Sequence, residues 1–351
     1  MRVRAEVTQL PEPKLEAPGH ADSERPSAEA LLTVKDLVVE YAVHSPTGRT
    51  TGATVRAVDG VSFEIGRGET LALVGESGCG KTTTGQALLG LRPILSGSVR
   101  YQGNELTSTS HRQLRRLRRR MQIVFQDPYS SLNPRLKVRD VVAEPLRIHR
   151  IGDRREQSRR VDECLEMVGL HTADGSQYPH EFSGGQRQRI GIARALALRP
   201  DFLVLDEPLS ALDVSTQAEI VNLLLDLQSE LALSYLFIAH DLAVVSAMCD
   251  RVAVMYLGRV VECGERSAVF RRPTHPYTQA LLSAVPRGLS AGPTMVSRVR
   301  LTGEVPSPDS IPSGCRFRGR CWRAADICEI EDPPLSDRKN HGHVSACHFP
   351  G

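Results

Sequence analysis

The chain has no run of about 18 or more apolar residues, so none of its segments is predicted to span a bilayer as a helix. The first 30 residues also lack the apolar core of a signal peptide, and we therefore expect the chain to remain in the cytoplasm. A formal net charge of +3 is too small to indicate a nucleic-acid partner. The basic run at residues 115–120 is interpreted as a solvated surface helix, with nucleic acid or anionic lipid as the alternative. Since hydrophobic residues make up 40% and charged residues 24% of 351 positions, the composition is that of a globular protein with room for two or three small domains.

A glycine-rich segment between an expected strand and an expected helix is the strongest functional signal. It reads Gly-Glu-Ser-Gly-Cys-Gly-Lys-Thr from Gly75 to Thr82, after the apolar run 71–74 and before a helix expected at about 81–89. The backbone N–H groups of such a loop turn inward around phosphate oxygens, and the helix N-terminus adds its dipole. Lys81 is placed to reach the β- and γ-phosphates, and the Thr82 hydroxyl to ligate Mg²⁺. The alternative is a glycine-rich turn that binds nothing. The predicted nucleotide-binding residues here are Gly75, Ser77, Gly78, Cys79, Gly80, Lys81, Thr82 and Thr83.

A second backbone nest is expected about a hundred residues later, at the start of another helix. It consists of Ser183, Gly184, Gly185 and Gln186, and apolar residues at helical spacing follow it. One chain does not need two phosphate nests for one nucleotide. A dimer that holds nucleotide between the loop of one subunit and the nest of the other needs both.

Together these motifs resemble the nucleotide-binding subunit of an ATP-binding cassette (ABC) transporter, whose signature the Ser-Gly-Gly-Gln run matches. The family signature commonly begins with leucine, where this chain has the apolar Phe182. The resemblance implies an α/β fold, an ABC-type nucleotide-binding domain. Its parts would be a mostly parallel phosphate-loop core sheet, an antiparallel β subdomain, a helical insert and a small cysteine-containing C-terminal extension. It also implies ATP and Mg²⁺ as ligands and ATP hydrolysis as the reaction.

Two adjacent acids follow the apolar run 202–205, as in the Walker B motif. Asp206 is well placed to hold Mg²⁺, directly or through water. Glu207 resembles the family's general base, which orients or deprotonates the attacking water. A solvated loop with two acids is the alternative.

Four further positions match cassette motifs. The resemblance implies that Gln126 touches Mg²⁺ and the attacking water and links the ATP site to the membrane partner. It implies that His240 contacts the γ-phosphate and that Asp213 belongs to the D-loop. Tyr41 corresponds to the aromatic residue that stacks on adenine, although tyrosine on an alternating strand is often a packing residue. A histidine after a strand, similarly, can be an ordinary surface residue.

The pattern of elements predicts three parts of the chain. Residues 1–30 are expected to be a disordered leader, 31–270 the ATPase domain, and 271–351 a C-terminal extension. Within the ATPase domain, antiparallel strands are expected at 31–40 and 55–65.

The rest of the ATPase domain is expected to alternate strands with helices, which implies a mostly parallel sheet covered on both faces. The helical insert is expected at about 127–182, with helices near 138–148 and 156–168. The expected elements of the core are strands at 71–74, 121–125, 202–206 and 235–239, a helix through 220–231, and a closing hairpin at 252–263.

The C-terminal extension narrows the resemblance to the oligopeptide and dipeptide importer branch. The segments that carry it are 270–282, the proline-rich 304–308, 314–321 and 346–349, together with 126–134 in the cassette. Nickel and glutathione importers are built alike, so they stay alternatives for the cargo. The resemblance implies permease subunits, a second ABC ATPase that is a copy or a paralogue, and, indirectly, an extracytoplasmic substrate-binding protein. The chain would then sit peripherally on the cytoplasmic face of the membrane.

Four cysteines lie in this extension, at Cys315, Cys321, Cys328 and Cys347. A reducing cytosol argues against disulfides. Four thiolates in a small, proline-rich module can enclose a metal, which would supply folding energy to a weakly apolar segment. The resemblance suggests a [4Fe-4S] cluster. Zinc, with histidines at 341, 343 and 348 nearby, and plain reduced cysteines are the alternatives.

A function of another class is a soluble ABC ATPase of DNA repair or translation. Such proteins commonly carry two cassettes or a long coiled-coil insert, whereas this chain has one cassette and a short insert. We therefore expect an ATP-hydrolysing subunit that energises a membrane importer of peptides.

Overall fold

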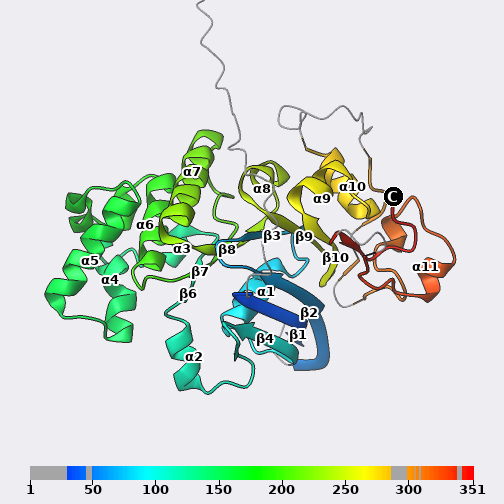
Figure 1. Cartoon of the computed structure of the whole chain (residues 1–351), viewed down its shortest axis with the longest axis horizontal. Coiled ribbons are helices and arrows are strands. Elements are labelled where there is room, and N and C mark those ends of the chain that lie inside the picture. The colour runs from blue at the N-terminus through cyan, green and yellow to red at the C-terminus, as the bar shows by residue number, and fades with distance from the viewer. Residues whose placement is uncertain (1–29, 45–49, 286–298, 305, 308–309, 338–341) are drawn as a thin grey trace, which may run out of the picture.

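A computed structural model describes residues 30–44, 50–285, 299–304, 306–307, 310–337 and 342–351 (Figure 1). The leader predicted for residues 1–30 falls outside these ranges, apart from Ala30. Within the described ranges, no helix is both long enough and apolar enough to cross a membrane.

A seven-stranded sheet in the order β11-β10-β9-β3-β8-β7-β6 forms the centre of the molecule (Figure 1). Five of its strands are parallel. At one edge, β10 pairs antiparallel with β9, and β11 pairs antiparallel with β10. This confirms the mostly parallel core and its closing hairpin. The strands are β3 (Thr70–Val74), β6 (Met121–Val124), β7 (Phe202–Asp206), β8 (Ser234–Ala239), β9 (Arg251–Tyr256), β10 (Arg259–Glu265) and β11 (Val344–Ser345).

The parallel strands are apolar along their length because both faces of the sheet are covered. In β3, Leu71 and Leu73 belong to one hydrophobic core, whereas Ala72 and Val74 belong to the other. This follows from the two-residue side-chain period of a strand. A single five-residue strand thus anchors the phosphate loop in two cores at once.

A four-stranded antiparallel sheet packs over one of these faces, together with α1 (Lys81–Leu88). Its order is β2-β1-β4-β5, with β1 (Leu32–His44), β2 (Thr50–Ile65), β4 (Ser96–Tyr101) and β5 (Asn104–Glu105). The predicted antiparallel pair β1–β2 is confirmed. The sequence analysis did not predict β4 and β5, because β4 opens with Ser-Gly-Ser, which has little strand propensity.

Helices cover the other face, and the insert lies at one side of the molecule (green in Figure 1). Its helix α5 begins with a capping box, in which Asp153 caps the helix and the Glu156 side chain accepts from the Asp153 N–H. The predicted helices near 138–148 and 156–168 are confirmed as α4 and α5. The helices after α1 are α2 (His111–Leu117), α3 (Pro128–Ser131), α4 (Val138–His149), α5 (Arg154–Met167), α6 (Gly184–Leu196), α7 (Val214–Leu231), α8 (Leu242–Met248), α9 (Arg266–Arg271), α10 (Pro276–Ser283) and α11 (Ile327–Ile330). Three short 3₁₀ helices are η1 (Thr172–Ser176), η2 (Pro179–Glu181) and η3 (Arg318–Arg320).

The basic run 115–120 is only partly a helix, since α2 ends at Leu117. Several of its arginines form hydrogen bonds or ion pairs with other residues of the chain. Arg118 donates to the carbonyls of Leu89 and Gly90, and Arg120 pairs with Asp201 at 2.7 Å. Their charge is therefore used to join α2 to the surrounding chain.

Aromatic packing fastens the C-terminal extension to the cassette. Phe317 is 1% exposed, and its ring lies 5.3 Å from that of Tyr256 and 5.4 Å from that of Tyr277. The neighbouring Arg316 forms an ion pair with Asp59 on β2. Burial of an aromatic ring of this size stabilises the contact by about 2–3 kcal/mol.

A buried carboxylate makes a second attachment, at the edge of the sheet. Glu262 on β10 is fully buried and accepts hydrogen bonds from the backbone N–H groups of Thr274 and His275. Its Oε1 also lies 2.6 Å from His343 Nε2, beside β11. Burial alone would raise the pKa of Glu262, but the bond to His343 and the backbone donors hold it below its usual range.

Replacing Glu262 with Gln is expected to destabilise the attachment of the extension by about 2 kcal/mol at neutral pH. Because the folded-state pKa is lowered, the carboxylate's contribution is complete above the unfolded-state pKa of about 4.3 and is lost as the pH falls below it. The measurement is the free energy of unfolding of the variant and of wild type in denaturant, at a series of pH values. The signal is the fluorescence of Trp322, the chain's single tryptophan. A difference that does not shrink at acid pH would contradict this role.

Candidate active site

The phosphate loop follows β3 and leads directly into α1, as predicted. Two of its glycines are required by close backbone contacts. A Cβ on Gly75 would lie 2.1 Å from the Met255 carbonyl oxygen, and one on Gly80 would lie 2.1 Å from that of Ala57. The loop is therefore pressed between β9 and β2, and only glycine allows this approach.

Lys81 is 4% exposed, and its ammonium group lies inside the loop. Its Nζ donates to the carbonyls of Gly75 and Glu76 at 2.9 and 3.1 Å. The Cys79 Sγ lies 4.0 Å from the same Nζ and is buried. The loop thus gathers a positive charge at the N-terminus of a helix, the environment that suits phosphate oxygens.

Two of the predicted Mg²⁺ ligands form a hydrogen bond between the start of α1 and the end of β7. The Thr82 hydroxyl donates to Asp206 Oδ1 at 2.7 Å, although 124 residues separate them. Burial, together with the nearby Glu207 carboxylate, raises the pKa of Asp206. A buried carboxylate of this kind gains from a nearby cation, so the two oxygens fit a magnesium ion.

Three predicted catalytic side chains converge at the carboxyl ends of the parallel strands. The Gln126 amide donates to Glu207 Oε2 at 2.9 Å, and His240 Nδ1 lies 3.5 Å from the same oxygen. Lys81 Nζ lies 3.8 Å from Glu207 Oε1. Glu207 therefore stands between the phosphate loop, the end of β6 and the end of β8.

The backbone of Glu207 is in the left-handed region, with φ of 44°. This conformation is unusual for a residue other than glycine, asparagine or aspartate, and it costs about 1–3 kcal/mol. A hydrogen bond from its N–H to the Ile238 carbonyl, at 3.0 Å, holds it in place. A cavity of about 60 Å³ adjoins its side chain and is also lined by Ser210, Gln217 and His240. Its size is sufficient for water.

Tyr41 lies close to the phosphate loop. Its hydroxyl donates to the Thr83 Oγ1 at 3.1 Å, and the Arg92 guanidinium lies 5.3 Å from the centre of its ring. The structure places the ring beside the first turn of α1. Stacking of this ring on adenine stays a prediction.

The signature segment lies on a different part of the chain. Ser183 caps α6, with its Oγ accepting from the Gln186 N–H at 3.3 Å. Gly184 and Gly185 face the neighbourhood of α7, where a Cβ would meet Leu212 and Thr216. Among the described residues, no hydrogen bond or ion pair joins residues 183–186 to the phosphate loop. In Figure 1, α6 lies with the insert, whereas α1 lies beside the four-stranded sheet.

Asp213 has a local structural role in this chain. It caps α7 and accepts from the Ser215 hydroxyl at 2.6 Å and from the Thr216 N–H at 3.0 Å. These bonds, the one from Ser215 above all, lower its pKa. Since Thr216 also lies against Gly185, the D-loop and the signature segment share one surface.

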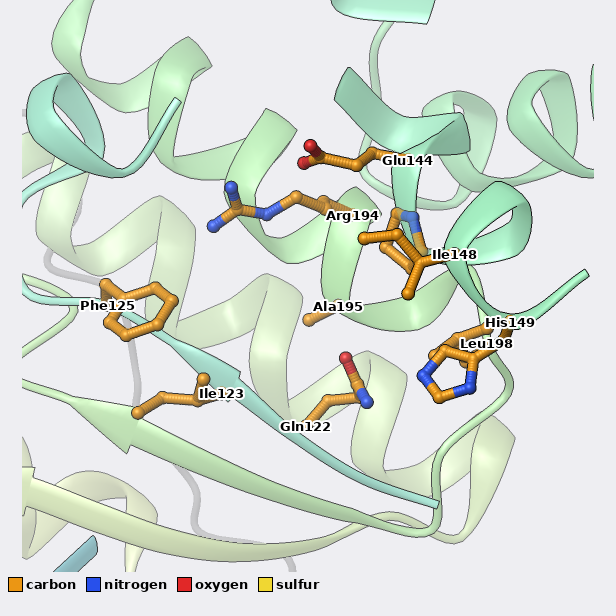
Figure 2. Close-up of a pocket in the computed structure, with 10 residues that line it drawn as sticks. Gln122, Ile123, Phe125, Glu144, Ile148, His149, Arg194, Ala195 and Leu198 are labelled. Atoms are coloured by element: carbon orange, nitrogen blue, oxygen red, sulfur yellow. The ribbon is translucent and has the colours of Figure 1, made fainter. Parts of the chain in front are cut away.

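A larger hollow opens next to Gln126, on the side of the insert (Figure 2). Its volume is about 230 Å³, and it is bounded by β6, α4 and α6. Phe125, the residue before Gln126, lies on one wall, the Arg194 guanidinium lies 5.9 Å from the centre of its ring, and Glu144 lies farther along the hollow. Burial lowers the pKa of Arg194.

The sequence analysis missed the contact between the phosphate loop and the C-terminal extension. Arg320 donates two hydrogen bonds to the Glu76 carboxylate, and the Tyr277 hydroxyl accepts from the Glu76 N–H. More than 200 residues separate each pair, with sequence separations of 244 and 201. A single sequence carries no local signal for such a contact.

The metal site predicted in the extension is not supported. All four cysteines are described, yet among the described residues no three His, Cys, Asp or Glu side chains are grouped so that they could hold a metal ion. Cys328 and Cys347 are buried, and burial, together with the neighbouring cysteines, raises the pKa of Cys315 to about 11. His343, a candidate zinc ligand, contacts Glu262 instead. The structure therefore gives no support for a [4Fe-4S] cluster or for Zn²⁺ at these cysteines.

Comparison with known proteins matches the cassette and the C-terminal extension to two separate family models. Residues 58–210 match the ABC transporter family, and residues 261–328 match the oligopeptide/dipeptide transporter C-terminal region. Two relatives come from Bacillus subtilis (strain 168). YkfD, provisionally named an oligopeptide transport ATP-binding protein, is 50% identical over 313 residues, which cover 89% of this chain and 94% of YkfD. The oligopeptide transport ATP-binding protein AppF is 46% identical over 92% of this chain and 98% of its own length.

Solved structures agree with the fold. The ATP-binding cassette MJ0796, described as a dimer in a post-hydrolysis state bound to ADP and Pi, matches with a TM-score of 0.60 and 28% identity. The match covers 67% of this chain and 98% of that one. The chain cbiO1 from Clostridium perfringens, part of the ABC transporter complex cbiONQ, matches with a TM-score of 0.59 and 31% identity over 69% of this chain and 90% of its own.

Proposed function

Because the chain belongs to the ATP-binding proteins of ABC transporters, in the oligopeptide and dipeptide transporter branch, we propose that it hydrolyses ATP to drive peptide import across a membrane. The observation that carries the proposal is the meeting of Gln126, Glu207 and His240 beside the Thr82–Asp206 pair. These side chains come from separate segments and share the end of one sheet.

The phosphate loop and Lys81 hold the β- and γ-phosphates of ATP, and Thr82 and Asp206 hold Mg²⁺. When bound, the ion neutralises charge on the phosphate oxygens. Glu207 accepts a proton from the attacking water or orients it, within reach of the adjoining cavity. Gln126 and His240 fix the position of the Glu207 carboxylate, since both contact the same oxygen.

The signature residues act on a nucleotide held by a second subunit. In one chain they cap α6 and lie apart from the phosphate loop, so they are free to complete another site. Ser183, Gly184, Gly185 and Gln186 would then supply donors to the γ-phosphate across a dimer interface. Asp213 and α7 border the same surface and would lie at this interface. The second subunit is a copy of this chain or a related cassette.

The hollow beside Gln126 is the proposed contact with the permease (Figure 2). At about 230 Å³ it has room for a few side chains. A permease segment seated there would touch the wall formed by Phe125, the insert helix α4 and the signature helix α6. Movement of that wall reaches Glu207 through the next residue, Gln126. The chain would thus sit peripherally on the cytoplasmic face of the membrane, with an extracytoplasmic binding protein delivering the cargo.

The division into a leader, an ATPase domain of residues 31–270 and an extension of 271–351 is part of this proposal. The names of the relatives support peptides as cargo over nickel or glutathione, and they support transport over a soluble ATPase of DNA repair or translation.

Co-purification from detergent-solubilised membranes tests the function. We expect the full-length chain to bring down polytopic membrane subunits, and the recovered complex, supplied with its binding protein, to hydrolyse ATP faster when peptides are added. Recovery without membrane subunits would contradict a transport function. Stimulation by nickel or glutathione, with none by peptides, would contradict the cargo.

A further inference from the structure

Every polar group of Glu76, the second residue of the phosphate loop, has a partner. Its N–H donates to the Tyr277 hydroxyl oxygen at 2.8 Å, and its carbonyl accepts from Lys81 Nζ at 3.1 Å. Its carboxylate accepts two hydrogen bonds from Arg320, at 2.7 and 2.9 Å. Tyr277 and Arg320 both belong to the C-terminal extension, so the extension forms hydrogen bonds to both the backbone and the side chain of this loop residue.

The Arg320–Glu76 pair is partly shielded from water. The Arg320 side chain is 9% exposed and that of Glu76 is 27% exposed. Two parallel N–H···O bonds between a guanidinium and a carboxylate are stronger and more directional than a single ionic contact. Such a pair is worth more than an ion pair on the open surface.

The extension holds Arg320 in place independently of Glu76. Arg320 ends η3, which follows Phe317 in the aromatic cluster and Arg316 in its ion pair with Asp59. The Arg320 guanidinium also lies 5.9 Å from the ring centre of Tyr256. The loop is therefore attached to a group that is already fixed by packing.

A carboxylate inside a phosphate loop opposes the binding of a triphosphate, because like charges repel most strongly where water is excluded. Arg320 neutralises that charge and holds the Glu76 side chain toward the extension. We propose that Arg320 and Tyr277 are positioning residues for ATP, through which the C-terminal extension forms part of the nucleotide site by holding Glu76. This inference rests on ATP binding at the loop, as the proposed function states.

The test is a double-mutant cycle on Mg-ATP affinity, measured by equilibrium binding to the full-length chain. Replacing Arg320 with Ala is expected to weaken binding about tenfold in the wild-type background. In a Glu76→Gln background, the same replacement should change affinity less than about threefold, because the charge to be neutralised is gone. An equal loss in both backgrounds would overturn the proposal, since Arg320 would then act without Glu76.

Tyr277→Phe is a second, milder variant. It keeps the ring in the aromatic cluster and removes only the hydroxyl that accepts from the Glu76 N–H. We expect Mg-ATP binding about threefold weaker, with only a small decrease in Tm because the Glu76 N–H loses its acceptor. Unchanged affinity would remove Tyr277 from the proposed role.

Arg318→Ala is the matched control. Arg318 lies in the same 3₁₀ helix but donates to Ser313 and to the Glu329 carbonyl, away from the loop, so ATP affinity should not change. Trp322 fluorescence checks that the extension stays docked in every variant. In the transporter, Arg320→Ala should raise KM for ATP and leave kcat nearly unchanged. A wild-type chain that does not bind Mg-ATP would contradict the proposed function, whereas normal affinity of Arg320→Ala would contradict this inference alone.

Discussion

Replacing Glu207 with Gln should reduce ATP turnover by about 10² or more and leave ATP binding close to normal. The amide has the same size as the carboxylate, and its oxygen can still accept from Gln126, so the geometry of the site is kept. It cannot take a proton from water, however. Phosphate release by the purified complex measures turnover, and equilibrium binding of Mg-ATP measures affinity.

Glu219→Gln on α7 is the matched control. The Glu219 side chain is 64% exposed and pairs with Arg189, outside the site, so turnover should stay at the wild-type level. Phosphate release near the wild-type rate from Glu207→Gln would show that another group is the base.

Replacing Gly184 with Asp is expected to have the second large effect, a loss of turnover of about 10² or more. A negative charge would then stand where we propose that the signature meets the γ-phosphate held by the partner. The change suits the chain's own fold, because a Cβ at Gly184 meets its nearest neighbour, Leu212, at 3.4 Å, and an acid in the first turn of α6 is favoured by the helix dipole. Phosphate release by the complex is the measurement.

Two comparisons separate the causes. Gly184→Asn has nearly the same size without the charge and should lose less activity. The isolated Gly184→Asp chain should keep its thermal stability and its own Mg-ATP binding, since the phosphate loop lies elsewhere. Full turnover by a complex that carries Gly184→Asp in every cassette would contradict the action of the signature across a dimer.

The local motifs were predictable because their chemistry depends on neighbouring residues. The phosphate loop was recognised from the apolar strand before Gly75 and the helix after Lys81, and β3 and α1 confirm both. The acids at 206 and 207 were expected at the end of a buried strand, where β7 places them. The strand β4 was missed because its first residues lack the alternation of apolar and polar side chains by which a strand is recognised in a sequence.

Long-range contacts were less accessible to sequence reasoning. The four cysteines suggested a metal because they are close in sequence, yet no group of side chains placed to hold a metal ion was found in the described parts of the chain. The sequence analysis assigned no role to Arg320, because its bond to Glu76 depends on how the extension packs against β9 and β10.

The amino-acid order was therefore enough to establish the family and the core of alternating strands and helices, and to predict the groups that handle phosphate. These depend on spacings of a few residues, over which backbone geometry is nearly constant. Folding of the whole chain was needed to bring Gln126, Glu207 and His240 together, to set the signature apart from the loop, and to lay the extension on Glu76. Such contacts join residues up to 244 positions apart, and packing of side chains selects them.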